Sequence, residues 1–477
     1  MNHNLKVIVL ASAVILFVPV HIFGGWIQTY YWDDHNDGEC VHQTRDGGYI
    51  AIGDTYSVDS EESDLCLLKT DNLGISQWSR LYGGAGNDEG YSGIQVSDGY
   101  VIAGVTTSYG SGTWDLWVFK TDLEGDSVWA FTYGGEGAEG GNCIEITEDG
   151  GFIVSGSTDS FGSGSFDGWL LKLNSQGDTV WTRTYGGADY EHFFCVETTD
   201  DGGYVLAGKA GADPNYSDLW LVRVDSYGNT LWTRTYGTDK KDEGYCVRQT
   251  DDGGYIVVGF VDASPSCTVG DLWLLKTDES GDTLWTRRYG GDFNADQGSC
   301  IQITNDGSYI ITGWTKSFGE GGFDLWLLKT DSHGDILWTR TYGGEGHEIG
   351  AYCEQTNDGG YIIAGYTESF AVAETDLWLI KTDSAGLVNA VNESVVDTKG
   401  YLQYVSKIDR EIIIKYRDMP RGFSASVFDA SGRRIDEILN SQASGKVAWG
   451  DGFSPGVYFM WVSTPHGVQR SKVVLTE

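Results

Sequence analysis

The sequence predicts an all-β protein, a seven-bladed β-propeller with four-stranded blades followed by a small β-sandwich. Three observations support this prediction. A repeat of about 52 residues runs through most of the 477-residue chain, each repeat contains four short strand-like runs, and the run missing from the last repeat is found near the N-terminus. Self-similarity at a fixed period of this length is typical of propellers and repeat arrays.

The repeat is seen most clearly in the aromatic residue that follows a DGGY-like turn. This residue recurs at intervals of 51 to 54 positions, at Tyr49, Tyr100, Phe152, Tyr204, Tyr255, Tyr309 and Tyr361. No segment with the 3.6-residue periodicity of a helix interrupts the series.

Within one repeat, the four strand-like runs lie at 245–250, 254–260, 271–278 and 283–289. The second and third runs are continuously apolar, which is typical of strands buried on both faces. The Asp-Gly turn between the first two favours a tight hairpin of type I′, with positive φ at both central residues. The link between the last two fits a type I turn ending in a left-handed glycine, Gly281. Four such strands per repeat describe a propeller blade.

The ends of the repeat region predict how the ring closes. The fourth run is marked by a tryptophan at Trp78, Trp129, Trp181, Trp232, Trp285 and Trp338, and the seventh repeat has none. The missing run appears at the start of the chain as 26–30 (WIQTY). We therefore expect 26–30 to pair with the third strand of the last repeat and close the ring.

Repeated tryptophans and cysteines are interpreted as core residues. The third run carries Trp117, Trp169, Trp220, Trp273, Trp326 and Trp378, with Cys66 in the first repeat. Cysteines lie nine residues before the turn aromatic at Cys40, Cys143, Cys195, Cys246 and Cys300, and Cys353 is one residue out of register. Since no CxxC or clustered histidine accompanies them, buried thiols are expected in preference to zinc ligands.

Charge and the N-terminus restrict the class of partner. The formal net charge is -38, and residues 399–477 contribute +3 of it, so the rest of the chain carries -41. Such an acidic surface repels phosphate backbones, and nucleic acid is not expected as a partner. Residues 1–25 contain Lys6 and an apolar run at 7–20, the pattern of a signal peptide. We expect an exported protein with no membrane span after removal of this segment.

Acidic residues in the links between repeats are the candidate binding residues. They are Asp37, Glu89, Glu139, Glu191, Glu243 and Glu348, with Gln297 in the remaining repeat. Together with the links between the second and third runs, they should lie on one face as an acidic rim. Two interpretations stay open. The carboxylates brace turns by accepting backbone hydrogen bonds, or some of them bind calcium, although 33–38 (DDHNDG) is only a degenerate calcium loop.

No catalytic residue can be assigned. GxSxG and HExxH are absent, and the eight histidines are scattered. The segment D-x-x-G-x-x-x-W is similar to the tryptophan-docking motif of quinoprotein dehydrogenases, a similarity that concerns structure and implies no quinone. No cofactor is expected, apart from calcium as an open alternative.

The region 399–477 forms a separate domain after a linker at 389–398. It contains short strand-like runs at 411–416, 425–428, 456–462 and 471–475, which predict a small β-sandwich. Its segments VFDASGRRI (427–435), SPGVYFMWV (454–462) and RSKVVLTE (470–477) resemble the C-terminal type A sorting domain of the type IX secretion system. The resemblance implies that this domain interacts with the export machinery and directs the protein to the outer cell surface or the medium.

The propeller (26–388) resembles uncharacterised secreted repeat proteins with DGGY, DLWLxKTD and LWxxTYGG blades, and this resemblance implies a fold without an activity. We expect a secreted or cell-surface binding module with a protein or glycan ligand. The alternative is a secreted enzyme, acting on glycans, with its site on the loop-rich face of the propeller.

Overall fold

The computed structural model describes residues 25–57, 62–213, 216–263, 269–291, 294–372 and 374–388, together with most of the strands and turns between 402 and 475. The predicted signal peptide and the predicted linker at 389–398 lie outside the described residues, apart from Gly25. Among the residues described, no helix is long and apolar enough to span a membrane.

In the described part of 26–382, the strands form seven four-stranded antiparallel sheets, which we number as blades 1 to 7. Blade 1 is β2 (His35–Gln43), β3 (Tyr49–Ser57), β4 (Glu62–Thr70) and β5 (Ser76–Tyr82). Blade 2 is β6 (Asp88–Val96), β7 (Gly99–Thr106), β8 (Asp115–Thr121) and β9 (Ser127–Tyr133). Blade 3 is β10 (Glu139–Ile146), β11 (Phe152–Thr158), β12 (Asp167–Leu173) and β13 (Thr179–Tyr185). Blade 4 is β14 (Tyr190–Thr198), β15 (Tyr204–Asp213), β16 (Tyr216–Val224) and β17 (Thr230–Tyr236).

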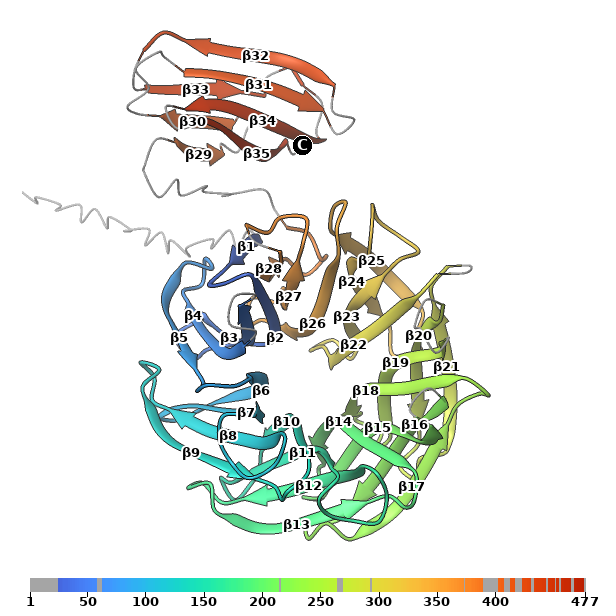
Figure 1. The fold of residues 1–477 in the computed structure, drawn as a ribbon. Helices are drawn as coiled ribbons and strands as arrows, with labels where there is room; N and C mark the ends of the chain where they lie inside the picture. The colour runs from blue at the N-terminus through green and yellow to red at the C-terminus, as the bar shows by residue number, and fades with distance from the viewer. Residues whose placement is uncertain are drawn as a thin grey trace, which may run out of the picture.

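Blade 5 is β18 (Lys241–Gln249), β19 (Tyr255–Ala263), β20 (Asp271–Thr277) and β21 (Thr283–Tyr289). Blade 6 is β22 (Asp296–Ile303), β23 (Tyr309–Thr315), β24 (Asp324–Thr330) and β25 (Ile336–Tyr342). Blade 7 is β26 (Glu348–Gln355), β27 (Tyr361–Thr367), β28 (Asp376–Thr382) and β1 (Trp26–Tyr30). Figure 1 shows the blades around a common centre, with the first strand of each blade innermost. The predicted β-propeller class is confirmed.

The predicted closure of the ring is also confirmed. Strand β1 pairs antiparallel with β28, with Trp26 opposite Lys381 and Tyr30 opposite Leu377. The N-terminal segment thus supplies the outer strand of the last blade, as the missing tryptophan run predicted. Both ends of the propeller chain therefore meet in one sheet, with β1 as its outermost strand.

The outer strands join neighbouring blades through their aromatic residues. The tyrosine that ends each outer strand donates a hydrogen bond to the carbonyl oxygen of a turn glycine in the next blade. The closing strand does the same, because Tyr30 bonds to Gly74 of blade 1. Gly74 has φ of 75°, and a Cβ placed on it would lie 2.7 Å from the Trp26 ring. Glycine is therefore required there both by the left-handed turn and by the stacked tryptophan.

The DGGY-like turn of each blade is held by an ion pair between its aspartate and a cation of the third strand. Lys276 and Asp252, 2.9 Å apart, are one example. The turns differ from the predicted type I′ geometry. In blade 1 only Gly47 of the turn has positive φ, and its N–H bonds to the Thr44 carbonyl oxygen. One left-handed glycine is therefore enough to form this turn. Asp46 keeps a negative φ, and its side-chain carboxylate accepts a hydrogen bond from the Gly48 N–H.

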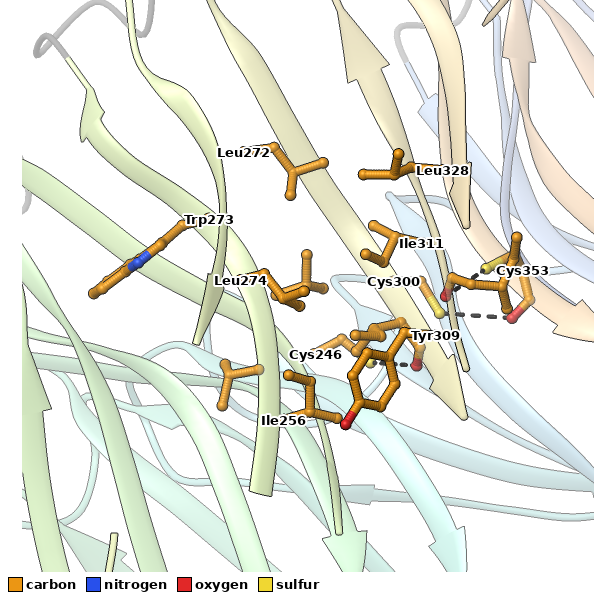
Figure 2. Packing of buried hydrophobic residues seen from close by; sticks show 14 of the residues in the cluster. Cys246, Ile256, Leu272, Trp273, Leu274, Cys300, Tyr309, Ile311, Leu328 and Cys353 are labelled. Carbon is orange, nitrogen blue, oxygen red and sulfur yellow. Dashed lines mark hydrogen bonds between the residues drawn. The ribbon is translucent and has the colours of Figure 1, made fainter. Parts of the chain in front are cut away.

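The core lies between the blades. The third-strand tryptophans are at most 7% exposed, so their interpretation as core residues is confirmed. In the described part, seven cysteines are free thiols and six of them are buried. Figure 2 shows Cys246, Cys300 and Cys353 in a row among apolar side chains. We call the inner-strand position that Cys40 occupies in blade 1 the cysteine slot. In blade 7 the residue in this slot is Tyr352, so Cys353 lies one position beyond it, as predicted.

The C-terminal region forms two further sheets. One contains β29 (Leu402–Ser406), β30 (Ile412–Tyr416) and β33 (Gly445–Trp449), and the other contains β31 (Phe423–Asp429), β32 (Arg434–Asn440), β34 (Gly456–Thr464) and β35 (Gly467–Leu475). Trp449 of the first sheet lies 5.1 Å from the ring of Tyr458 of the second and donates a hydrogen bond to Asp436. The two sheets therefore share a core, as a β-sandwich does.

Candidate functional site

The two sets of links that the sequence singled out lie at the same end of the propeller, which we call the loop-rich end. The loop between the second and third strands of one blade is hydrogen-bonded to the link that enters the next blade. For example, the Thr113 N–H bonds to the Gly137 carbonyl oxygen and the Glu139 N–H to that of Trp114, both at 2.8 Å. These loops are therefore a braced part of the scaffold.

Two adjacent positions at the start of each inner strand form rings of residues around the loop-rich end. The residue at the first position braces the neighbouring turns, and we call it the bracing position. Its residue lies four places before the cysteine slot of the inner strand and is at most 6% exposed. The residues at this position are Asn36, Asp88, Glu139, Glu191, Asp242, Asp296 and Glu348. Glu348 is representative: its carboxylate accepts hydrogen bonds from the Gly344 N–H at 2.9 Å, the Ser369 N–H at 2.8 Å and the Thr367 hydroxyl at 2.9 Å.

The next residue along the inner strand is different in almost every blade. Together with its cross-strand partner on the second strand, it forms a set of seven pairs that we call the variable ring. The pairs are Asp37–Asp54, Glu89–Val105, Gly140–Ser157, His192–Lys209, Glu243–Phe260, Gln297–Trp314 and Ile349–Tyr366. The repeat thus keeps similar residues at the bracing position and varies the residues next to it.

A β-bulge follows directly after the variable ring, preceded by a glycine pair in every blade but blade 4, where Phe193 lies opposite Gly208. In blade 1, Gly38 pairs with Gly53, and the register then shifts before Cys40. A Cβ on Gly53 would lie 1.9 Å from the Asp37 carbonyl oxygen, so the two backbones approach too closely for any side chain. The bulge leaves one extra residue unpaired in each blade, and this residue also varies, for example Glu39, Tyr91, Phe194 and Tyr245.

Blades 1 and 2 fill the variable ring with carboxylates, and we call Asp37, Glu39, Asp54 and Glu89 the acidic flank. Burial, together with the negative charges of Asp37 and Glu89, raises the pKa of Glu39 to about 7. Burial and the charge of Glu89 also raise the pKa of Asp37, and burial with the charges of Glu39, Asp37 and Glu89 raises the pKa of Asp54. Like charges held this close cannot all ionise, so part of this flank is protonated near neutral pH.

Blades 4 and 5 fill the same level with cations and aromatic rings. Lys209 lies 3.0 Å from Glu243, and its ammonium group lies over the rings of Tyr190 and Phe194 at 5.4 and 5.7 Å. The ring of Phe194 also contacts that of Tyr245 at 4.9 Å. Although burial alone would raise the pKa of Glu243, Lys209 and Lys241 hold it below its ordinary value. We call His192, Lys209, Glu243, Tyr190, Phe194 and Tyr245 the cationic–aromatic flank.

A second polar layer lies further along the inner strands. His42 and Glu354 are 2.6 Å apart, and Arg248 contacts Glu197 and Gln302 at 3.3 Å. Despite burial, Cys40 and Glu354 raise the pKa of His42 well above its usual range. These residues occupy equivalent slots of their blades and form mutually satisfied pairs.

The structure divides the six predicted rim residues into two groups. Asp37, Glu89 and Glu243 belong to the variable ring, whereas Glu139, Glu191 and Glu348 occupy the bracing position and face their own turns. The spacing to the cysteine slot, three residues against four, is the sequence signal that separates the groups. Sequence reasoning missed Lys209, His192 and Asp54, because pairing across strands cannot be read from a single repeat. Among the described residues, no group of three or more His, Cys, Asp or Glu side chains is arranged to hold a metal ion.

Comparisons with known proteins add little beyond the fold. No family model matches the chain. The regulatory protein FlaEY of Caulobacter vibrioides is 25% identical over 224 residues, which cover 40% of this chain and 23% of that protein. The chain thus matches less than a quarter of that relative's length.

Several solved structures share the architecture at low identity. They include PorZ, a surface component of the type-IX secretion system of Porphyromonas gingivalis (TM-score 0.43, 9% identity, 91% of this chain and 59% of that one). Others are the WD40 domain of Neurospora crassa Pan2 (0.45, 9%, 75% and 91%) and a puromycin hydrolase (0.45, 15%, 89% and 58%). Similarity at this level assigns neither an activity nor a partner to the chain.

Proposed function

We propose that this protein is an exported β-propeller that binds its ligand through the variable ring at the loop-rich end. The variable ring carries the proposal: seven positions that are equivalent by strand register hold seven different pairs, next to bracing residues that are nearly uniform. Charged and aromatic side chains gathered on a rigid scaffold are the usual composition of a recognition surface.

A glycan array probed with the full-length protein tests this proposal. We expect binding that is lost when Asp37→Asn, Lys209→Met and Glu243→Gln are combined. The matched control combines Asp251→Asn and Glu279→Gln, two exposed acidic residues in turns at the opposite end. Equal loss of binding in the control, or unchanged binding in the triple variant, would place recognition elsewhere on the molecule.

A hydrolase is the second candidate function, and the acidic flank favours it. A general acid needs a pKa near the working pH, and a neighbouring ionised carboxylate can complete a pair that cleaves a glycosidic bond. Glu39, with its pKa raised to about 7, and Asp37 fit these two roles. Release of nitrophenol from a panel of aryl glycosides, abolished by Glu39→Gln, would support hydrolysis. No release from any substrate would leave the binding module as the function.

Export through the sorting-domain-like region 399–477 is part of the same proposal, and it rests on the sequence motifs of that region. In a host with the type IX system, a chain lacking 399–477 should accumulate in the periplasm, while the full chain reaches the surface or the medium. Arrival of the truncated chain at the surface would show that the region is an accessory domain.

A further inference from the structure

The cationic–aromatic flank contains an unused hydrogen-bond donor whose position follows from its neighbours. The side-chain amide of Asn142 donates to the carbonyl oxygen of Phe193 at 2.7 Å, which fixes its nitrogen on that side. The same nitrogen lies 2.7 Å from Nε2 of His192, so it donates its second proton there and Nε2 is an acceptor. The His192 proton therefore resides on Nδ1, and Nδ1 is buried without a hydrogen-bond partner among the described residues.

The charge state of His192 agrees with this assignment. Burial and the nearby Lys209 ammonium lower the pKa of His192 to about 4, so the ring is neutral at physiological pH. A buried donor without a partner is unfavourable, and such a group in a folded protein calls for an explanation. A ligand oxygen that accepts the Nδ1 proton supplies one.

Lys209 provides a second donor beside the first. It is the cross-strand partner of His192, so both side chains leave the sheet on the same face. Its side chain is only 14% exposed, and among the described residues its ammonium group has one carboxylate within reach, that of Glu243 at 3.0 Å. Glu243 is shared with Lys241 at 3.3 Å and also accepts from the Tyr245 hydroxyl at 2.8 Å. Lys209 thus receives only part of one negative charge, and a largely buried cation favours an additional anion.

The aromatic residues define the rest of the ligand. Phe194 lies between His192 and Tyr245, with ring centroids 4.8 and 4.9 Å away. Such a platform suits a flat or weakly polar ring. The protein carries a net charge of -38, so a polyanion would be repelled at long range, whereas a single negative charge is screened beyond about 8 Å at physiological ionic strength.

Building on the proposed function, we propose that the cationic–aromatic flank binds a small ligand with one carboxylate on a ring body. One carboxylate oxygen accepts from His192 Nδ1–H, the other pairs with Lys209, and the ring lies against Phe194. An acidic monosaccharide and an aromatic acid share this chemistry.

Calorimetric titration of the full-length protein with glucuronate, benzoate, glucose and methyl glucuronate tests the proposal, and the acid that binds more tightly identifies the ligand source. We expect the acids to bind and the neutral sugar and the ester not to bind. Lys209→Met and His192→Phe should each weaken binding about tenfold or more, the usual effect of removing a hydrogen bond to a charged group. Lys316→Met is the matched control, because Lys316 also lies over an aromatic ring, that of Phe323 at 5.6 Å, and this ring contacts His347, but Lys316 does not belong to the variable ring.

Two outcomes would overturn the inference. Equal affinity for acids in Lys209→Met and wild type would show that the carboxylate does not meet this lysine. No binding of either acid, together with a glycan-array ligand that depends on Asp37 or Glu39, would reject the carboxylate ligand and retain the variable ring as the binding site. If no binding in either the titration or the glycan array changes when residues of the variable ring are replaced, both proposals are rejected.

Discussion

Two adjacent residues on each inner strand have different roles. Glu348 of blade 7 is fully buried and accepts three hydrogen bonds from its own blade's turns and strands, and chemically similar residues take that place around the ring. Ile349, the next residue, pairs with Tyr366, and its equivalents range from carboxylate to imidazole to glycine. A one-residue step therefore separates the bracing position from the proposed binding surface, since neighbouring residues of a strand face opposite sides.

The comparison predicts that scaffold changes alter stability while changes in the variable ring alter binding. The largest effect should come from the ring closure. Deleting residues 26–31 removes β1, its ladder with β28 and the contacts of Trp26 and Tyr30 with blade 1. We expect loss of a single cooperative thermal transition, measured by calorimetry. An unchanged transition would mean that β1 contributes nothing to the ring.

A single bracing residue should have the next largest effect. Glu348→Ala leaves the Gly344 and Ser369 N–H groups and the Thr367 hydroxyl without their acceptor, and we expect a loss of about 2–4 kcal/mol in the free energy of unfolding. Its neighbour provides the control, since Ile349→Thr should change the free energy of unfolding by about 1 kcal/mol or less. Urea unfolding of both variants measures the difference. Equal losses would contradict the division into two positions.

The acidic flank should make stability depend on pH. Because the pKa of Glu39 is raised from 4.5 to about 7, the folded protein keeps a proton that the unfolded chain loses between these values. The free energy of unfolding therefore falls as pH rises through this window. Glu39→Gln should melt several degrees higher than the wild type at pH 8, with a smaller difference at pH 5. The same difference at both pH values would show that the Glu39 carboxyl keeps its ordinary pKa.

Calcium should have the smallest effect. The carboxylates at the bracing position already accept N–H and hydroxyl donors, as Glu139 does from Gly135 and Thr158, and a cation would have to displace those donors. We expect nearly equal melting temperatures in millimolar calcium and in chelator at matched ionic strength. A large stabilisation by calcium that disappears in Asp37→Asn/Glu39→Gln would make the acidic flank a metal site.

The repeat predicted the propeller, the strand order within a blade and the closing strand, because side-chain period and turn residues are local properties of the sequence. The strands β29, β32 and β33 of the C-terminal region were missed, since none of these runs alternates clearly. The candidate site was only half predicted. Glu139 and Glu89 were placed in one rim because both lie in the link from an outer to an inner strand, although the strand register shows that they are one position apart. The pairing of His192 with Lys209 depends on contacts between strands, which composition and spacing do not reveal.

The pairing of β1 with β28 also sets the order in which the molecule can be assembled. Trp26 is made early in synthesis and its partner Lys381 only after six complete blades, so the last ladder to form joins the most distant parts of the propeller. Contacts at such long sequence separation are intrinsically slow to form. The strands of each earlier blade are adjacent in sequence, whereas the seventh blade has to wait for both ends. A nascent propeller therefore remains an open arc until its final strand emerges, and the seven blades become a closed ring only at this last step.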